Sequence, residues 1–126
     1  MRAEVVLPWP PTVNSIWRRG QGRTYRRPSY MAWREAAEIA LYGLAAEEPY
    51  AGRVSVECRL YAPSRRVYDV DNRAKAICDI LEGTLLVNDS QIDRLVMRRG
   101  HHHKPAGAVW VLVEAMDAGV CPRLPS

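Results

Sequence analysis

The sequence predicts a single α/β domain of the α+β type, in which a mixed β-sheet carries two main helices. Hydrophobic residues make up 48% of the 126 residues, which is enough to form a core. Polar and apolar residues alternate over residues 54–60, which predicts a half-buried strand, and residues 109–113 form an apolar run typical of a buried strand. Apolar residues recur at helical spacing over residues 29–46 and 72–82, which predicts two helices. We expect the two strands to be central and the helices to pack against the sheet.

The other elements follow in chain order. Residues 3–7 predict a short strand, which the following prolines end because proline cannot continue a β-ladder. Residues 93–99 predict a further strand, and residues 100–107 predict a hairpin loop to the last strand. We expect the domain to span residues 1–117 and the proline-containing residues 118–126 to form a flexible C-terminal tail.

Neither the histidines nor the cysteines form a zinc pattern. His101, His102 and His103 are consecutive, and neighbouring residues of an extended chain point to opposite sides, so three in a row seldom bind one ion. Cys58, Cys78 and Cys121 are odd in number and widely spaced. We therefore expect an exposed histidine loop and, for the first two cysteines, core thiols.

The kind of charge is more informative than its amount. The formal net charge is +4, and of 18 basic residues 16 are arginine, Lys75 and Lys104 being the lysines. Arginine offers a planar fork to phosphate oxygens, although an arginine-rich composition also follows from a GC-rich genome. No apolar run approaches the roughly 20 residues of a membrane span. Because Glu4 and Pro8 interrupt the first apolar stretch, we expect no signal peptide and a cytoplasmic location.

A basic segment lies over residues 18–27, with five arginines, two glycines and one tyrosine. Its polarity excludes it from a core. It can be interpreted as an arm that contacts phosphates or as a solvated hairpin, and composition alone leaves both interpretations open.

Two aspartates, Asp69 and Asp71, precede the second predicted helix. In an extended segment this spacing points both side chains to one face, where the like charges repel unless a cation lies between them. Hard oxygen ligands of this kind suit Mg²⁺ or Mn²⁺. The alternative is structural, because an aspartate directly before a helix is usually an N-cap, and Asp71 has that position.

A third aspartate, Asp89, follows the apolar run of residues 85–87. If that run is a strand beside the first, Asp89 reaches the same site, and three carboxylates together with Lys75 surround a divalent ion. The alternative is again structural, since residues 88–90 also have the composition of a turn.

These residues resemble those of the RusA-type Holliday junction resolvases, small endodeoxyribonucleases of bacteria and their phages. The most specific part is D-x-D-N-x-x-K followed by N-D-S-Q, within which Asp79 also matches. Where the family often has two acidic residues, this chain has Asn88 and Asp89, and Asn88 still offers a carbonyl oxygen. The matching segments are, in order, residues 7–14, residues 22–24, a helix bearing Tyr30 and Arg34, and residues 69–72, 88–92 and 109–113.

The resemblance implies a RusA-like fold, a homodimer, and cleavage of four-way DNA junctions with Mg²⁺, or Mn²⁺ as a substitute, and without a small-molecule cofactor or a membrane. The implied catalytic residues are Asp69, Asp71, Asp89 and Lys75, of which the three aspartates bind the metal. The expected DNA-binding residues are Asn14, Arg18, Arg19, Arg23, Arg26, Arg27, Arg65 and Arg66. The alternatives are a nuclease of the same fold that prefers flaps or other branches, and a non-catalytic protein that binds branched DNA.

Overall fold

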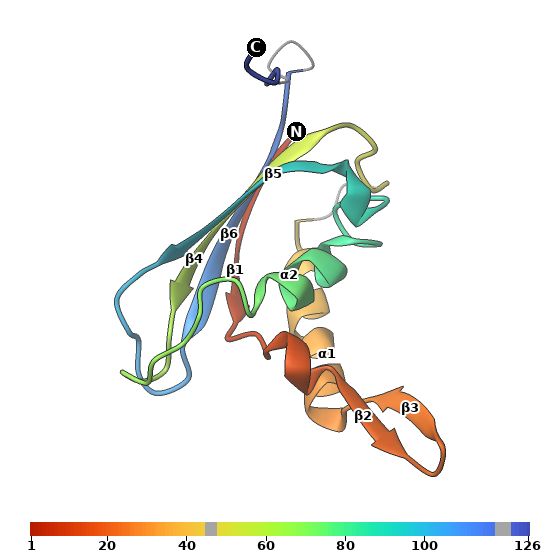
Figure 1. Ribbon diagram of the computed structural model, residues 1–126, viewed down its shortest axis with the longest axis vertical. Helices are drawn as coiled ribbons and strands as arrows, with labels where there is room; N and C mark the ends of the chain where they lie inside the picture. The colour runs from red at the N-terminus through yellow and green to blue at the C-terminus, as the bar shows by residue number, and fades with distance from the viewer. Residues whose placement is uncertain (45–47, 118–121) are drawn as a thin grey trace.

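The computed structural model describes residues 1–44, 48–117 and 122–126, and two helices and six strands are found there (Figure 1). Two short 3-10 turns, η1 and η2, complete the elements. In chain order they are β1 (Arg2–Pro8), η1 (Val13–Ser15), β2 (Trp17–Gly20), β3 (Arg23–Arg26), α1 (Pro28–Tyr42), β4 (Val54–Tyr61), α2 (Ala74–Leu81), η2 (Asp89–Gln91), β5 (Ile92–Arg99) and β6 (Ala108–Ala115).

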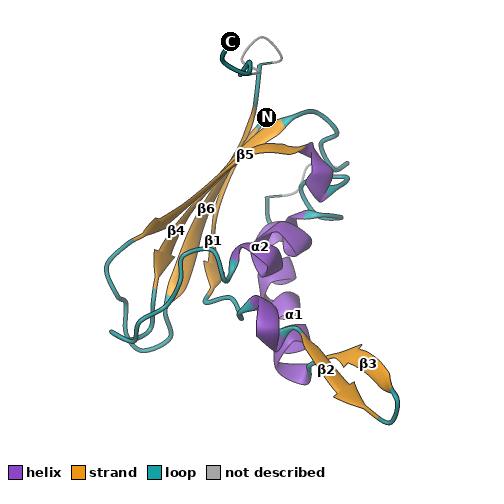
Figure 2. Ribbon diagram, viewed as in Figure 1, coloured by secondary structure: helices purple, strands orange, loops and turns teal. Residues whose placement is uncertain are grey.

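Four strands form a mixed sheet in the order β1-β6-β4-β5. The pairs β1–β6 and β6–β4 are antiparallel, whereas β4 and β5 are parallel. The α+β class and the central position of the strands over residues 54–60 and 109–113 are therefore confirmed. Since β1, β4 and β5 run in the same direction, their carboxyl ends share one edge of the sheet, the lower edge in Figure 2.

Both helices lie on the same side of this sheet (Figure 2). The buried side chains of α1 recur at helical spacing, and its Trp33 Nε1 donates a hydrogen bond of 2.9 Å to the carbonyl of Pro8, which ties α1 to the end of β1. The helix predicted over residues 29–46 is confirmed through Tyr42. Residues 43 and 44 form a turn instead, and residues 45 and 46 lie outside the described residues. Residues 118–121 of the predicted tail, including Cys121, also lie outside them.

Two expectations about connections are wrong. Residues 100–107 do not close a hairpin, because β4 lies between β5 and β6 in the sheet. Residues 85–87 are not a strand, because Leu86 makes only isolated bridges to Tyr50 and Glu82. Both errors arise from the same cause, since apolar runs show that a segment is buried and do not show which neighbour it pairs with.

The second helix begins later than predicted and without a carboxylate cap. α2 starts at Ala74 with Arg73 at the N-cap, and no side chain caps it, so the N-cap interpretation of Asp71 is wrong. Gly83 follows the helix with a positive φ of 82°, as the predicted C-terminal glycine requires. None of the helices in the described parts of the chain is long and apolar enough to cross a bilayer.

The basic segment is a two-stranded hairpin, β2–β3, that projects from the body beyond α1 (Figure 1). All of its strand residues except Gly20 are exposed. The hairpin interpretation is thus confirmed for the backbone. Its arginines are exposed, although Arg27 Nε donates to the Trp17 carbonyl (3.2 Å) and Arg26 lies over the Trp17 ring.

Candidate active site

The acidic stretch is a turn and not an extended segment. The amide of Asn72 donates to the carbonyl of Asp69 (3.4 Å), and the amide of Ala74 donates to the carbonyl of Asp71 (3.1 Å). The expectation that an extended backbone points both aspartates to one face is therefore wrong. Both aspartates are exposed, and their side chains make no hydrogen bond or ion pair with another described residue.

Two hydrogen bonds fix this turn to the segment that follows β1. The amide of Val13 donates to the carbonyl of Asn72 (2.9 Å), and Arg73 Nε donates to the carbonyl of Pro10 (2.8 Å). Asn14, one of the predicted DNA-binding residues, directly follows Val13 and therefore lies close to the acidic turn. The carboxyl edge of the sheet thus positions both the aspartates and Asn14.

On α2, Lys75 is paired with a carboxylate that the predicted catalytic set did not include. Its Nζ lies 2.8 Å from Asp79 Oδ1, one helical turn away. The hydrogen bond to Asp79 raises the pKa of Lys75, burial opposes this, and the charges of Asp79 and Asp89 add to it. Lys75 is therefore protonated at neutral pH and held along the surface of α2.

Asp89 lies near the same side of α2. Burial is the first cause that raises the pKa of the Cys78 thiol to about 11, and the next is the negative charge of Asp89. Asp89 also acts on Lys75, so the structure brings Asp89 and Lys75 into one electrostatic neighbourhood. As for Asp69 and Asp71, no hydrogen bond or ion pair with a described residue engages the Asp89 side chain.

A buried glutamine holds the turn that carries Asp89. Gln91 is 6% exposed, and its Nε2 donates to the carbonyls of Tyr50 (2.7 Å) and Gly52 (2.8 Å). Its Oε1 accepts from the amide of Asn88 (2.8 Å), while Asn88 Oδ1 accepts from the amide of Ser90 (2.8 Å), which completes a capping box. Sequence reasoning gave Gln91 no role, although asparagine followed three residues later by glutamine was the available signal.

The donor chemistry at this site suits Mg²⁺, whereas the side chains are not gathered into a ligand set. Three carboxylates without a protein partner are hard oxygen donors, which Mg²⁺ prefers. In the described ranges, however, no three histidine, cysteine, aspartate or glutamate side chains lie close enough together to hold a metal ion. The magnesium site therefore stays a prediction, and the three histidines form no such group either.

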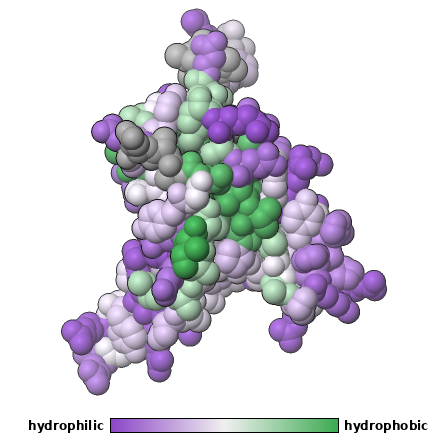
Figure 3. Space-filling view, turned by 180° about the vertical axis from the view of Figure 1, so that it is seen from behind, coloured by the Kyte–Doolittle hydropathy of each residue, from purple (hydrophilic) through white to green (hydrophobic). Residues whose placement is uncertain are grey.

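The predicted DNA-binding arginines lie on two projections that flank the acidic turn. Five are exposed on or next to the β2–β3 hairpin, and two are exposed in the loop after β4. Seen from behind, both lower projections are largely hydrophilic, and hydrophobic surface gathers between them and above (Figure 3). The hairpin residues are Arg18, Arg19, Arg23, Arg26 and Arg27, and the loop residues are Arg65 and Arg66.

Further arginines at the carboxyl edge were missed by sequence reasoning. Arg98 and Arg99 end β5 and, with Arg59, line a cavity of about 310 Å³. Arg73 and Arg99 pack over the rings of Trp9 and Tyr68. Their positions depend on which strands end at the same edge, and a chain with 16 arginines gives no local signal for that.

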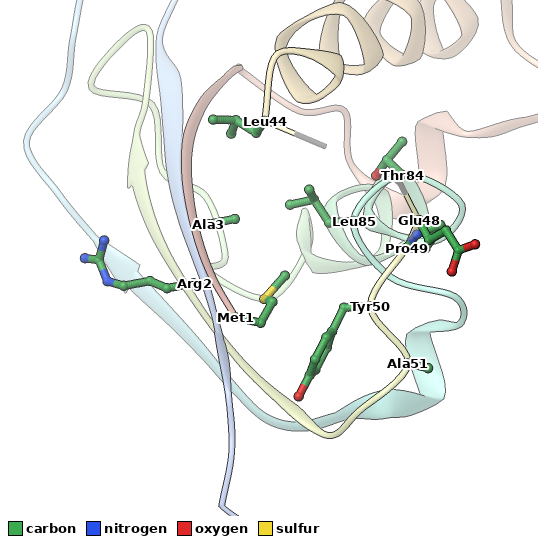
Figure 4. Close-up of a pocket in the computed structure, with 10 residues that line it drawn as sticks. All are labelled: Met1, Arg2, Ala3, Leu44, Glu48, Pro49, Tyr50, Ala51, Thr84 and Leu85. Atoms are coloured by element: carbon green, nitrogen blue, oxygen red, sulfur yellow. The ribbon is translucent and has the colours of Figure 1, made fainter. Parts of the chain in front are cut away.

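A larger cavity, of about 600 Å³, lies elsewhere, between the start of β1 and the segments at residues 48–51 and 84–85 (Figure 4). Its lining is mainly apolar, with Met1, Leu44 and Tyr50 among the side chains that face it (Figure 4). None of the residues predicted for catalysis or DNA binding lines this cavity.

Comparison with known proteins agrees with the resemblance. The sequence profile of the family Endodeoxyribonuclease RusA matches residues 8–113. A crossover junction endodeoxyribonuclease of Enterobacteria phage 82 is 30% identical over 89 residues, which cover 70% of this chain and 74% of the phage protein. Proteins of the same description from Escherichia coli and Shigella sonnei are 29% identical over the same shares of the two chains. The chain, with its acidic turn, its lysine and its two basic projections, belongs to the RusA family of endodeoxyribonucleases.

Proposed function

We propose that this protein cleaves four-way DNA junctions in a Mg²⁺-dependent reaction and serves DNA recombination and repair. The observation that carries the proposal is that Asp69, Asp71 and Asp89 make no hydrogen bond or ion pair with a described residue, while Asp89 acts on the protonated Lys75 of α2. Family membership and the description of the relatives as crossover junction endodeoxyribonucleases support the same substrate.

The proposed roles follow from charge and position. Asp69, Asp71 and Asp89 would hold Mg²⁺, which when bound supplies Lewis-acid stabilisation of the phosphoryl oxygens and an activated water. Lys75 is cationic, and it would stabilise the negative charge that develops on the phosphate in the transition state. The arginines of both projections would bind phosphates and so fix the orientation of the DNA without reading its sequence.

We also propose that the protein acts as a homodimer. A four-way junction has near two-fold symmetry and two strands must be cut, while one chain provides one acidic site. Closed two-fold pairing of identical chains supplies the second site. Light scattering that shows a monomer at micromolar concentration, with cleavage intact, would contradict this.

Two other functions compete with this one. A nuclease of the same fold that prefers flaps would cut a flap faster than a junction. A non-catalytic binder gains nothing from three unpaired carboxylates near DNA phosphates, because each adds repulsion.

One assay separates the three functions. Labelled junction, flap and linear duplex of matched sequence are incubated with Mg²⁺ and, in parallel, with EDTA. We expect paired cuts in the junction with Mg²⁺ alone. Preferential cutting of the flap would support the second function, and tight junction binding without any cut would support the third.

A further inference from the structure

An aromatic cavity of about 360 Å³ opens beside the acidic turn. Its volume falls within the roughly 300–1,000 Å³ of sites that receive small organic groups. Trp9 comes from the segment after β1, and Tyr68 and Arg73 come from the segment after β4, so two segments at the carboxyl edge build it. The other lining residues are Ala62, Pro63, Ser64, Arg66 and Val67.

The two aromatic rings are held at a right angle to one another. Trp9 and Tyr68 have ring centroids 5.5 Å apart and an interplanar angle of 89°. The guanidinium of Arg73 lies 4.5 Å from the Trp9 ring, and that of Arg99 lies 4.3 Å from the Tyr68 ring. Arg99 Nη2 also donates to the Tyr68 carbonyl (3.0 Å). These contacts fix both rings before any ligand arrives, which lowers the entropy lost on binding.

Arg73 adds free hydrogen-bond donors to this lining. Only its Nε is used, in the bond to the Pro10 carbonyl, and its two terminal nitrogens have no hydrogen-bond partner among the described residues. Burial lowers the pKa of this guanidinium, yet arginine stays charged at neutral pH. Flat aromatic walls with a planar donor group are the features with which proteins stack and hold unpaired nucleobases.

The position of the cavity in the chain sets its relation to the acidic turn. Tyr68 directly precedes Asp69, and Arg73 follows Asp71 by two residues. A strand whose phosphate lies at the aspartates therefore has its neighbouring base within reach of the cavity. A phosphate alone needs no aromatic wall, and an aliphatic ligand would leave Arg73 desolvated without a partner.

We propose that the cavity lined by Trp9, Tyr68 and Arg73 receives one unstacked nucleobase of the DNA strand whose phosphate lies at Asp69 and Asp71. This inference rests on the proposed function, because the ligand is a base at a branch point. Four-way junctions present such bases more readily than linear duplex, since unstacking costs least where pairing is already interrupted. The cavity would thus help to select branched DNA.

The test is an abasic scan of the junction. Four-way junctions that each carry one abasic nucleotide at successive positions around the branch point are bound to the full-length protein in EDTA, so that no cleavage occurs. We expect the dissociation constant to rise by about 5-fold to 150-fold at one position per strand, the range that loss of one stacked base gives.

Variants then link that position to the cavity. Trp9→Leu and Tyr68→Leu should bind the intact junction more weakly, and the abasic penalty should disappear in both. Tyr68→Phe keeps the ring and should keep the penalty, and so should Tyr42→Leu, which removes an exposed tyrosine from α1. If the leucine variants fold poorly, the abasic scan of the wild-type protein still decides, because a junction without any penalised position overturns the base site.

The outcomes separate this inference from the proposed function. Junction binding without a penalty at any position overturns the base site and leaves the proposed function standing. A penalty that persists undiminished in folded Trp9→Leu and Tyr68→Leu also overturns it, because the rings would then be purely structural. If the wild-type protein binds a junction no more tightly than a linear duplex, the proposed function fails. The same abasic scan on single-stranded DNA then tests the base site independently of that function.

Discussion

Gln91→Met should destabilise the protein by about 3 kcal/mol. Methionine keeps the length and shape of glutamine, so the change removes three hydrogen bonds without opening a large cavity. Each such bond contributes about 1 kcal/mol net, and a buried group left without a partner costs at least that much. The carbonyl of Gly52 and the amide of Asn88 would lose their partners, whereas the carbonyl of Tyr50 keeps its bond from the Val87 amide.

Urea unfolding followed by tryptophan fluorescence measures this change. For an m value of about 2 kcal/mol/M, a loss of about 3 kcal/mol lowers the midpoint by about 1.5 M. Ser90→Ala is the matched control, because the Ser90 side chain makes no hydrogen bond with a described residue, and its free energy of unfolding should change by less than about 0.5 kcal/mol. Gln91→Glu should be worse than Gln91→Met, since a carboxylate would face two carbonyls.

The same variant tests whether Gln91 positions Asp89. In the absence of urea, and at a temperature where Gln91→Met is fully folded, junction cleavage by this variant should fall while junction binding persists. A Gln91→Met protein with a wild-type urea midpoint would refute the hydrogen-bond reasoning. A destabilised protein with unchanged cleavage would show that the turn at residues 88–91 contributes to folding only.

Three further predictions concern charge and thiol chemistry. The double variant Arg19→Gln/Arg23→Gln should reduce the slope of log affinity against log salt concentration by about 2, because each phosphate contact contributes about 0.9. The control Arg2→Gln/Arg94→Gln, at the opposite edge of the sheet, should leave the slope unchanged, and a wild-type slope in the hairpin variant would make the hairpin ordinary solvated surface. Burial raises the pKa of Cys58 to about 12, and burial together with the charges of Asp89 and Asp79 raises the pKa of Cys78 to about 11. In a Cys121→Ser background both thiols should therefore react slowly with a thiol reagent at pH 8, and fast labelling of the folded protein would contradict their burial. Asp79→Asn removes the partner that raises the pKa of Lys75, yet the lysine stays protonated at neutral pH, so a loss of cleavage at pH 7 would show that the position of Lys75 matters and not its charge state. Lys75→Met should slow cleavage without abolishing metal binding.

Local patterns in the sequence were sufficient for the elements that build the core. Alternation over residues 54–60 predicted β4, and its inward side chains Val54, Val56, Cys58 and Leu60 are fully buried. Helical spacing predicted α1 and α2 because each buries one stripe of apolar side chains in the common core. Strand order was beyond such patterns, since the insertion of β6 between β1 and β4 is decided by pairing over long sequence distances.

The candidate site was predictable in residue type and not in geometry. The aspartates stood out because carboxylates two apart repel, yet they lie in a turn. The backbone of this turn accepts a hydrogen bond from the Val13 amide, and its Arg73 side chain donates to the Pro10 carbonyl, both far away in the sequence. Arg73 acquires its place over Trp9 from the same contacts. Features that depend on two strands ending at one edge cannot be inferred from either strand alone.

The most direct test of catalysis by the acidic turn is the cleavage rate of Asp71→Asn. Asparagine keeps the size of aspartate and removes its charge, and the structure shows Asp71 exposed and capping no helix, so the urea midpoint should not change. Asp93→Asn is the matched control, because Asp93 is also exposed and is paired with Arg53 away from the turn.

We expect Asp71→Asn to bind the junction as tightly as wild type or more tightly, since one negative charge facing the phosphates is gone. Its Mg²⁺-dependent cleavage should collapse, as should that of Asp69→Asn and Asp89→Asn, while Asp93→Asn cleaves normally. Near-normal cleavage by a folded Asp71→Asn protein would contradict the assignment of this carboxylate to the active site.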